Sequence, residues 1–198
     1  RNLRSATALA STSVAMAAQV RRLTPERNDV AVTPFGVELS VFAPSGGRRV
    51  AGRITIGTVK SLAKTYGIDL LLRAFAGLTR DGELRALPFE LRLLVVGGGP
   101  ERERLETLAR ELGIPRSTEF VGAVAHVDVP LWLNRLEIYC APSRQESFGV
   151  AVIEASACGL PVVVSDVGGL PEVVRDGETG IVVGGGDVDP VAPQRGEL

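Results

Sequence analysis

The chain has 198 residues, of which 45% are apolar and 23% are charged, and its formal net charge is −1. This composition is typical of a soluble globular protein and excludes disordered and collagen-like chains. At roughly 150 residues per domain, the length predicts one full domain and a remnant of another. The near-neutral charge argues against a dedicated nucleic-acid-binding protein, which needs a basic surface.

Cysteine spacing and apolar runs bear on the compartment of the protein. Cys140 and Cys158 form no metal-binding spacing, which favours reduced thiols in a cytoplasmic protein. The longest nearly apolar stretch, 150–165, is interrupted by Glu154, a glycine and a proline. The sequence therefore predicts no membrane-spanning segment.

Both ends of the chain differ from its middle. Residues 1–20 combine arginines, alanines and an A-x-A-like segment as a secretory signal does, but serines and threonines interrupt the apolar run. We instead expect the end of a helix that belongs to a preceding domain. Residues 1–30 are expected to be loosely attached, and 184–198, rich in glycine and proline, to form a loose tail.

Between the ends, short β-branched runs alternate with amphipathic stretches. In chain order we predict strand 54–59, helix 67–80, strand 91–97, helix 101–112, strand 118–122, helix 129–136, strand 137–142, helix 148–159, strand 161–166, helix 170–177 and strand 180–183. Apolar strands separated by helices predict an α/β fold with a Rossmann-like parallel sheet of about six strands and helices on both faces. Ligands of such sheets bind in the loops at the C-terminal strand ends.

The loop after the first predicted strand, 57–67, contains both lysines of the chain. Lys60 and Lys64 stand four residues apart, whereas the other 20 basic residues are arginines. Two ammonium groups at this edge suit a diphosphate ligand. The alternative is that both are ordinary solvated loop lysines.

A second loop, after strand 91–97, carries Gly97, Gly98 and Gly99. Glycines between a strand and a helix allow a ligand to approach the backbone closely, although a tight turn explains them nearly as well. The dinucleotide-binding fingerprint would need a third glycine where Arg102 stands.

The third loop leads into helix 148–159, which is apolar on almost every face and is therefore predicted to be buried. Glu154 stands in the middle of this helix. A buried carboxylate needs partners because an unpaired buried charge is costly. Glu154 could form a structural ion pair with an arginine, or it could face a crevice and accept hydrogen bonds from ligand hydroxyls.

Glu146 precedes Glu154 by eight residues, with Gly149 and Val150 between them. The backbone N–H groups at a helix start form a natural anion site. Eight residues would span about 12 Å if they were helical throughout. An acid, an anion site and a second acid match the sugar, the diphosphate and the ribose of a nucleotide sugar.

These residues carry a family resemblance. The E-x7-E arrangement of Glu146 and Glu154 within 142–180 resembles the C-terminal, donor-binding domain of retaining GT-B glycosyltransferases of the family-four type. The resemblance runs from about 33 to 183. It includes TPFGVELSVFAP, which is similar to the segment leading into that domain, and IGTVKSLAKTYGIDLLLRAFA, which is similar to its first strand–helix unit.

The resemblance implies roles for individual residues. Glu146 would bind donor-sugar hydroxyls, Glu154 the ribose, and the Gly149 and Val150 amides the distal phosphate. It implies a catalytic set of Glu146, Lys60 and Lys64 and a donor-binding set of Gly98, Val124, Phe148, Gly149, Val150 and Glu154. In the second set, backbone near Val124 would meet the nucleobase, and Phe148 taken by itself is a core residue.

The sequence departs from the family in the loop after the first strand. Thr58 stands where the family has an arginine, so Lys60 is expected to supply that positive charge. The loop before Gly67 is longer than usual, which leaves the match of Lys64 open.

The resemblance also implies a domain plan and partners. We expect a remnant of an N-terminal domain and linker over 1–50, the donor domain over 51–183, and the tail. Such a fragment would bind a nucleotide-diphosphate sugar but, as an isolated chain, would transfer nothing. No cofactor or metal is expected, because lysines and helix amides would stabilise the charge on the leaving diphosphate.

The expected partners are a glycan, lipid or small-molecule acceptor and the N-terminal domain, which would make any peripheral membrane contact at the inner face of the cytoplasmic membrane. Two other functions remain open: a nucleotide-sugar binding module without catalysis, and another nucleotide-dependent Rossmann-like enzyme such as an oxidoreductase. His126, the only histidine, has no neighbouring ligand pattern and is expected to be an exposed loop residue.

Overall fold

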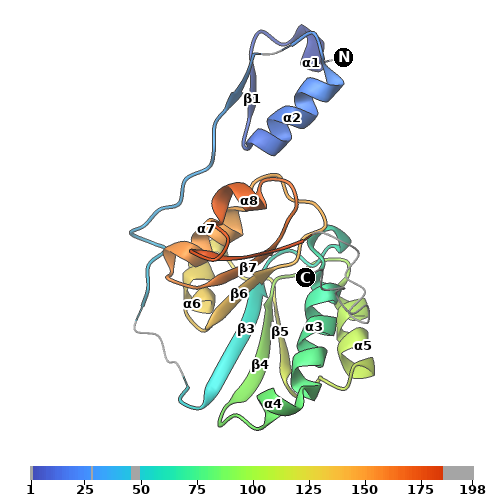
Figure 1. Ribbon diagram of the computed structural model, residues 1–198, viewed down its shortest axis with the longest axis vertical. Helices are drawn as coiled ribbons and strands as arrows, with labels where there is room; N and C mark the ends of the chain where they lie inside the picture. Colours follow the sequence, from blue (N-terminus) through green and yellow to red (C-terminus); the bar gives the residue numbers. More distant parts are fainter. Residues whose placement is uncertain (1, 28, 46–49, 185–198) are drawn as a thin grey trace, which may run out of the picture.

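A computed structural model describes residues 2–27, 29–45 and 50–184. Its main feature is a six-stranded sheet in the order β5-β4-β3-β6-β7-β8, with every neighbouring pair parallel (Figure 1). The strands are β3 (Arg53–Val59), β4 (Glu90–Val96), β5 (Thr118–Gly122), β6 (Ile138–Ala141), β7 (Val162–Ser165) and β8 (Gly180–Val183). The predicted α/β class and parallel sheet are confirmed.

Helices cover both faces of this sheet. On one side lie α3 (Ile68–Arg80), α4 (Gly82–Arg85) and α5 (Arg102–Glu111); on the other lie α6 (Val129–Leu133), α7 (Val150–Ala157) and α8 (Leu170–Val173) (Figure 1). Strand β4 shows why two cores form. Leu93 and Val95 join the core under α3 and α5, whereas Leu94 and Val96 join the core under α6 and α7, because successive strand residues point to opposite faces. Short 3-10 turns, η1 (Lys64–Tyr66) and η2 (His126–Asp128), precede α3 and α6.

Three helices, α6, α7 and α8, are clearly shorter than predicted. Helix α6 ends at Leu133 rather than at 136. Helix α7 begins at Val150 because Gly149 has φ +105°, a left-handed conformation outside the helical range. The estimate of about 12 Å for a continuous helix from Glu146 to Glu154 therefore does not apply. Helix α8 ends at Val173 because Val174 is extended, and a turn follows at 177–179, in which Gly177 donates to the Gly180 carbonyl.

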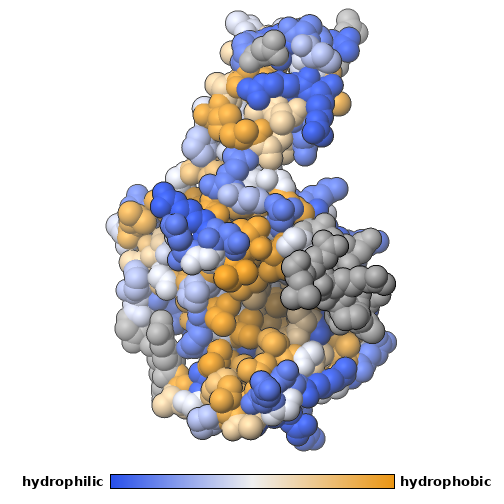
Figure 2. Space-filling model, in the orientation of Figure 1, coloured by the Kyte–Doolittle hydropathy of each residue, from blue (hydrophilic) through white to orange (hydrophobic). Residues whose placement is uncertain are grey.

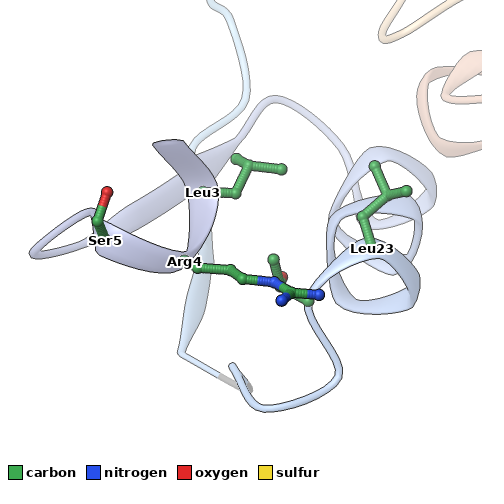
Figure 3. A pocket seen from close by; sticks show the side chains of 5 residues that line it. Leu3, Arg4, Ser5 and Leu23 are labelled. Carbon is green, nitrogen blue, oxygen red and sulfur yellow. The ribbon is translucent and has the colours of Figure 1, made fainter. Parts of the chain in front are cut away.

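The N-terminal residues form a small unit of their own. It consists of α1 (Asn2–Ser5), β1 (Leu9–Ser11), α2 (Val14–Leu23) and β2 (Val30–Val32), and its two strands are parallel. Leu9, Ala17 and Val30 make its core. The prediction of only a helix end was wrong, because three-residue strands are too short to show an alternating pattern. A hollow on this unit is lined by Leu3, Arg4, Ser5, Leu23 and Thr24 (Figure 3).

Helix α2 also contacts the larger unit. The Glu172 carboxylate of α8 accepts hydrogen bonds from the backbone N–H groups of Val14 and Ala15, both at 2.8 Å. The expectation that 1–30 is loosely attached stays a prediction, because two hydrogen bonds do not measure how firmly the unit is held. Most of the predicted tail, 185–198, lies outside the described residues.

Some apolar side chains are exposed at the surface of the larger unit. On the larger unit, apolar side chains gather on the face that Figure 2 shows, and the edge strand β8 exposes Ile181 and Val183. Within the described part of the chain, every helix is too short or too polar to cross a membrane.

Candidate functional site

The order of the strands locates the site. From β3 the chain proceeds outward to β4 and β5, whereas from β6 it proceeds the other way to β7 and β8. Strands β3 and β6 are neighbours, with Ile56 beside Ile138 and Gly57 beside Tyr139. The loops that leave their C-terminal ends therefore diverge, and parallel α/β sheets bind ligands at such a switch point.

Lys60 and Glu146 meet at this point. The Lys60 ammonium donates to Glu146 Oε2 at 2.6 Å, and the two side chains are only 17% and 11% exposed. The ammonium also lies over the Tyr66 ring, 4.4 Å from its centroid. Residues that are 86 positions apart in the sequence thus form a sheltered ion pair between the first and third predicted loops.

The glycine loop after β4 supports the Lys60 loop. The Lys60 N–H donates to the Val96 carbonyl and the Leu62 N–H to the Gly98 carbonyl, both at 2.9 Å. A Cβ on Gly97 would collide with the Lys60 carbonyl oxygen. The glycines thus let two loops pack backbone against backbone, and Gly98 lies beside Ala123 with its carbonyl accepting the hydrogen bond from Leu62.

A second pair of glycines supports Glu146. The Gly169 N–H donates to the Glu146 carbonyl at 3.2 Å, and a Cβ on Gly168 would collide with that same oxygen. Gly168 adopts φ +55°, in the left-handed region. The β7–α8 loop is therefore shaped to hold the backbone of Glu146.

An arginine–aspartate clasp ties the β3 and β6 loops together. Arg144 donates to both carboxylate oxygens of Asp69, at 2.8 Å each, and to the Lys64 carbonyl at 3.0 Å. Its backbone N–H donates to the Thr65 carbonyl at 2.8 Å. The hydrogen bonds from Arg144 hold the pKa of Asp69 below its ordinary value, because they stabilise the carboxylate. Sequence analysis did not single out either side chain.

The start of α7 presents free backbone donors. Its first intrahelical hydrogen bonds run from Val152 and Ile153 to the Gly149 carbonyl. Within the described residues, the N–H groups of Gly149 and Val150 have no hydrogen-bond acceptor. Gly149 is closely packed, because a Cβ there would lie 2.8 Å from Leu170 Cδ2. The free backbone N–H groups predicted at Gly149 and Val150 are therefore present, and their role in binding an anion stays a prediction.

Lys64 and Phe148 differ from the half-sheltered Lys60 in their surroundings: Lys64 is exposed and Phe148 is buried. Lys64 is exposed in η1, and its ammonium forms no ion pair with a described residue. Phe148 is buried, and its ring meets that of Phe35 edge to face with 5.7 Å between centroids. The structure thus brings Lys60, but not Lys64, to Glu146, and it packs Phe148 against the segment that leads into the domain.

Glu154 is buried as predicted, but its partner was not foreseen. His126 Nε2 donates to Glu154 Oε1 at 2.9 Å, and the Glu154 side chain is 10% exposed whereas that of His126 is 75% exposed. The proposed arginine partner is therefore wrong. His126 begins η2 in the loop after β5, which also contains the half-buried Val124. Its place four residues after strand 118–122 was the one available signal, because that loop opens at the ligand-binding edge.

Tyr139 of β6 lies between the two acids. Its hydroxyl donates to the Val59 carbonyl at 3.3 Å. Burial raises the pKa of this phenol well above its ordinary value, and the negative charges of Glu154 and Glu146 raise it further. Both carboxylates therefore act on one buried hydroxyl. Thr58, which stands in place of the family's arginine, is also buried and hydrogen-bonds with Tyr139.

Acidic, cysteine and histidine side chains do not cluster for a metal in the described residues, where no group of three or more could hold an ion. The arrangement at the switch point is instead one cation, two acids, a histidine and a helix N-terminus. These groups suit a ligand that carries both negative charge and hydroxyl groups.

Comparison with known proteins agrees with this geometry. A model of the family described as glycosyl transferases group 1 matches residues 46–193. The chain belongs to this family. A D-inositol 3-phosphate glycosyltransferase of Kribbella flavida is 38% identical over 177 residues, which is 82% of this chain and 41% of that protein. A GDP-mannose-dependent alpha-(1-6)-phosphatidylinositol monomannoside mannosyltransferase of Mycolicibacterium smegmatis is 34% identical, over 83% of this chain and 46% of its own length.

Solved structures of GT-B glycosyltransferases share the fold. Sucrose-phosphate synthase from Thermosynechococcus elongatus superposes with a TM-score of 0.82 at 29% identity, over 93% of this chain and 47% of its own. HepE from Anabaena, solved with UDP-glucose, superposes with a TM-score of 0.79 at 23% identity, over 93% and 52% respectively. The chain spans less than half the length of the two curated relatives.

Proposed function

We propose that this chain is the donor-binding half of a glycosyltransferase that moves a sugar from a nucleotide-diphosphate sugar to an acceptor with retention of configuration. The observation that carries this proposal is the Lys60–Glu146 pair beside the open N-terminus of α7, at the divergence of the β3 and β6 loops. Family membership supports it. The enzymatic activity is proposed for the whole protein rather than for these 198 residues.

The diphosphate would lie between Lys60 and the start of α7. A lysine ammonium has three N–H donors, so a single hydrogen bond to Glu146 leaves two for phosphate oxygens. The Gly149 and Val150 amides would face the same group, aided by the helix dipole. These fixed donors would stabilise the negative charge that builds up on the departing diphosphate without a metal ion.

The two acids would bracket the diphosphate. Glu146, held against Lys60, would accept hydrogen bonds from hydroxyls of the donor sugar, next to the phosphate that leaves. Glu154 would accept hydrogen bonds from the ribose hydroxyls. Hydrogen bonds to a carboxylate are charge-assisted and fix the orientation of a polyhydroxylated ligand.

The nucleobase and the acceptor are proposed only as classes of compound. HepE was solved with UDP-glucose and the mycobacterial relative is named for GDP-mannose, so both bases are candidates here. The acceptor is proposed to be a glycan, a lipid or a small molecule. A cytoplasmic location at the inner face of the cytoplasmic membrane is part of the same proposal.

Titration calorimetry tests the proposal. We expect the 198-residue chain to bind UDP, GDP or ADP more tightly than the matching nucleoside, and to show no preference for NAD. The chain alone should transfer no sugar, because transfer needs the acceptor hydroxyl held about 3–3.5 Å from the anomeric carbon in a closed cleft. Tighter binding of NAD than of every nucleoside diphosphate would instead favour an oxidoreductase.

A further inference from the structure

Glu154 and His126 form the one contact of the site in which a buried acid meets an exposed base. Glu154 lies on α7 after β6, and His126 lies in the loop after β5, so the pair joins the two loop systems on either side of β3. A carboxylate only accepts hydrogen bonds, so the His126 Nε2 carries the hydrogen that bridges to Oε1. The pair therefore has one defined tautomer at its contact.

The geometry leaves half of the carboxylate for a ligand. Within the described residues, the hydrogen bond from His126 uses Oε1, and Oε2 accepts no hydrogen bond. Because a carboxylate has about four acceptor sites, Glu154 can hold two ligand hydroxyls while it remains bonded to His126. The imidazole is 75% exposed, whereas the acid that it contacts is only 10% exposed.

His126 is itself held in place by the segment that leads into the domain. The His126 ring lies 5.5 Å from the ring of Phe42, centroid to centroid and tilted by 54°, and Phe42 is almost fully buried. One face of the imidazole is thus supported and its Nε2 points to Glu154. An exposed side chain with two defined contacts is better ordered than a solvated loop residue.

We propose that His126 is a positioning residue of the donor site, which orients Glu154 for the ribose and so sets the preference for ribonucleotides over 2′-deoxyribonucleotides. This inference rests on the proposed function, because it takes Glu154 as the ribose-binding acid. His126 acts through Glu154, since a carboxylate turned away from its bridge would no longer meet both hydroxyls of the ribose.

Calorimetry on the 198-residue chain with UDP and GDP and their 2′-deoxy counterparts tests this. We expect wild type to prefer the ribose form of the tighter-binding nucleotide by roughly tenfold or more, the value of one charge-assisted hydrogen bond. Two variants separate the roles of the imidazole. His126→Phe keeps a ring against Phe42 but lacks the donor, and His126→Gln keeps a donor without the ring.

The inference predicts that His126→Phe reduces the preference for ribose severalfold and that His126→Gln restores most of it, with affinity for the deoxy form unchanged in both. A purely structural histidine would weaken ribose and deoxyribose forms alike, and that result would overturn the inference. Glu154→Ala distinguishes the underlying function: if wild type binds no nucleotide, or if Glu154→Ala leaves the ribose preference intact, the proposed role of Glu154 fails and the inference with it.

Discussion

At the scale of single residues, Lys60 and Glu146 define the centre of the proposed site. Both side chains are mostly sheltered from water, and the Lys60 ammonium lies 2.6 Å from Glu146 Oε2. Removing one partner of a partly buried ion pair lowers stability strongly, because the other charge is left without an opposite charge. Lys64, four residues away and exposed, provides a matched lysine without this environment.

Replacing Lys60 therefore tests the diphosphate site. We expect Lys60→Ala to weaken binding of UDP or GDP by about 1.5–3 kcal/mol while barely changing binding of the free nucleoside, since only the diphosphate uses the ammonium. Lys64→Ala should change either affinity by less than about 0.5 kcal/mol. Calorimetric titrations that show equal losses for nucleoside and diphosphate would remove Lys60 from the phosphate site.

Sequence reasoning located residues whose type conflicts with their surroundings. Glu154 stood out as an acid in an apolar helix, and Lys60 as a rare lysine after a strand. His126 and Tyr139 were missed because their roles depend on which loops meet in space: their partners Glu154 and Val59 lie 28 and 80 positions away. No local pattern encodes such a pairing.

At the scale of secondary-structure elements, glycines and a clasp determine how the loops meet. Gly97 adopts φ +142°, and any side chain there would enter the Lys60 backbone. Gly77 in α3 has open space around it and an ordinary helical conformation. The same change to alanine can therefore be compared at Gly97, which has no room for a side chain, and at Gly77, which has room for one.

We expect Gly97→Ala to lower the free energy of unfolding by about 1–3 kcal/mol, since it combines backbone strain with a collision. Gly77→Ala should raise that free energy by about 0.5–1 kcal/mol, because alanine favours a helix. Thermal unfolding followed by circular dichroism measures both. A Gly97→Ala variant as stable as the wild type would show that the glycine loop is not tightly packed on the Lys60 loop.

The clasp between Arg144 and Asp69 makes a prediction for acid pH. The pKa of Asp69 is lowered in the folded state, so the pair contributes fully above the ordinary value near 3.8. Its contribution is lost as the pH falls below 3.8 through the folded pKa, where Asp69 becomes protonated. We expect Asp69→Asn to cost about 1 kcal/mol of stability at pH 6 and progressively less below pH 4. Urea unfolding at several pH values measures this, and a cost that stays constant down to pH 3 would contradict the assignment.

The elements themselves were largely predictable, because their apolar periods are strong. All six strands of the main sheet occur within one residue of their predicted limits, as for 118–122 and 180–183. The ends of α6, α7 and α8 were not predicted correctly. Gly149 and the extended Val174 interrupt α7 and α8, although the composition beyond them continues to favour a helix. The strands of the N-terminal unit were too short to be detected.

At the scale of the whole molecule, the carboxylate of Glu172 connects the N-terminal unit to the larger unit. Glu172 caps the start of α2 through two backbone N–H groups, at Val14 and Ala15. It follows directly on the glycine loop that supports Glu146. The contact between the two units is therefore adjacent to the proposed sugar-binding acid.

Removing this carboxylate should loosen the contact. Loss of a charged helix cap costs about 0.5–2 kcal/mol, so we expect Glu172→Ala to speed hydrogen exchange of the Val14 and Ala15 amides by roughly tenfold. Glu178→Ala is the matched control, because Glu178 is exposed and pairs only with Arg175 on its own turn. Exchange at 14 and 15 that is unchanged by Glu172→Ala would mean that the capping contact contributes nothing.

The most direct measurement is a map of where a nucleotide binds on the whole chain. Nuclear magnetic resonance of the uniformly ¹⁵N-labelled chain, titrated with UDP and with GDP, reports every backbone amide at once. We expect the largest shifts at Lys60, Gly149, Val150 and Glu154, around the divergence of β3 and β6. Shifts confined to the hollow beside Leu3 and Leu23, or to the opposite sheet edge near Arg53 and Glu137, would contradict the central claim.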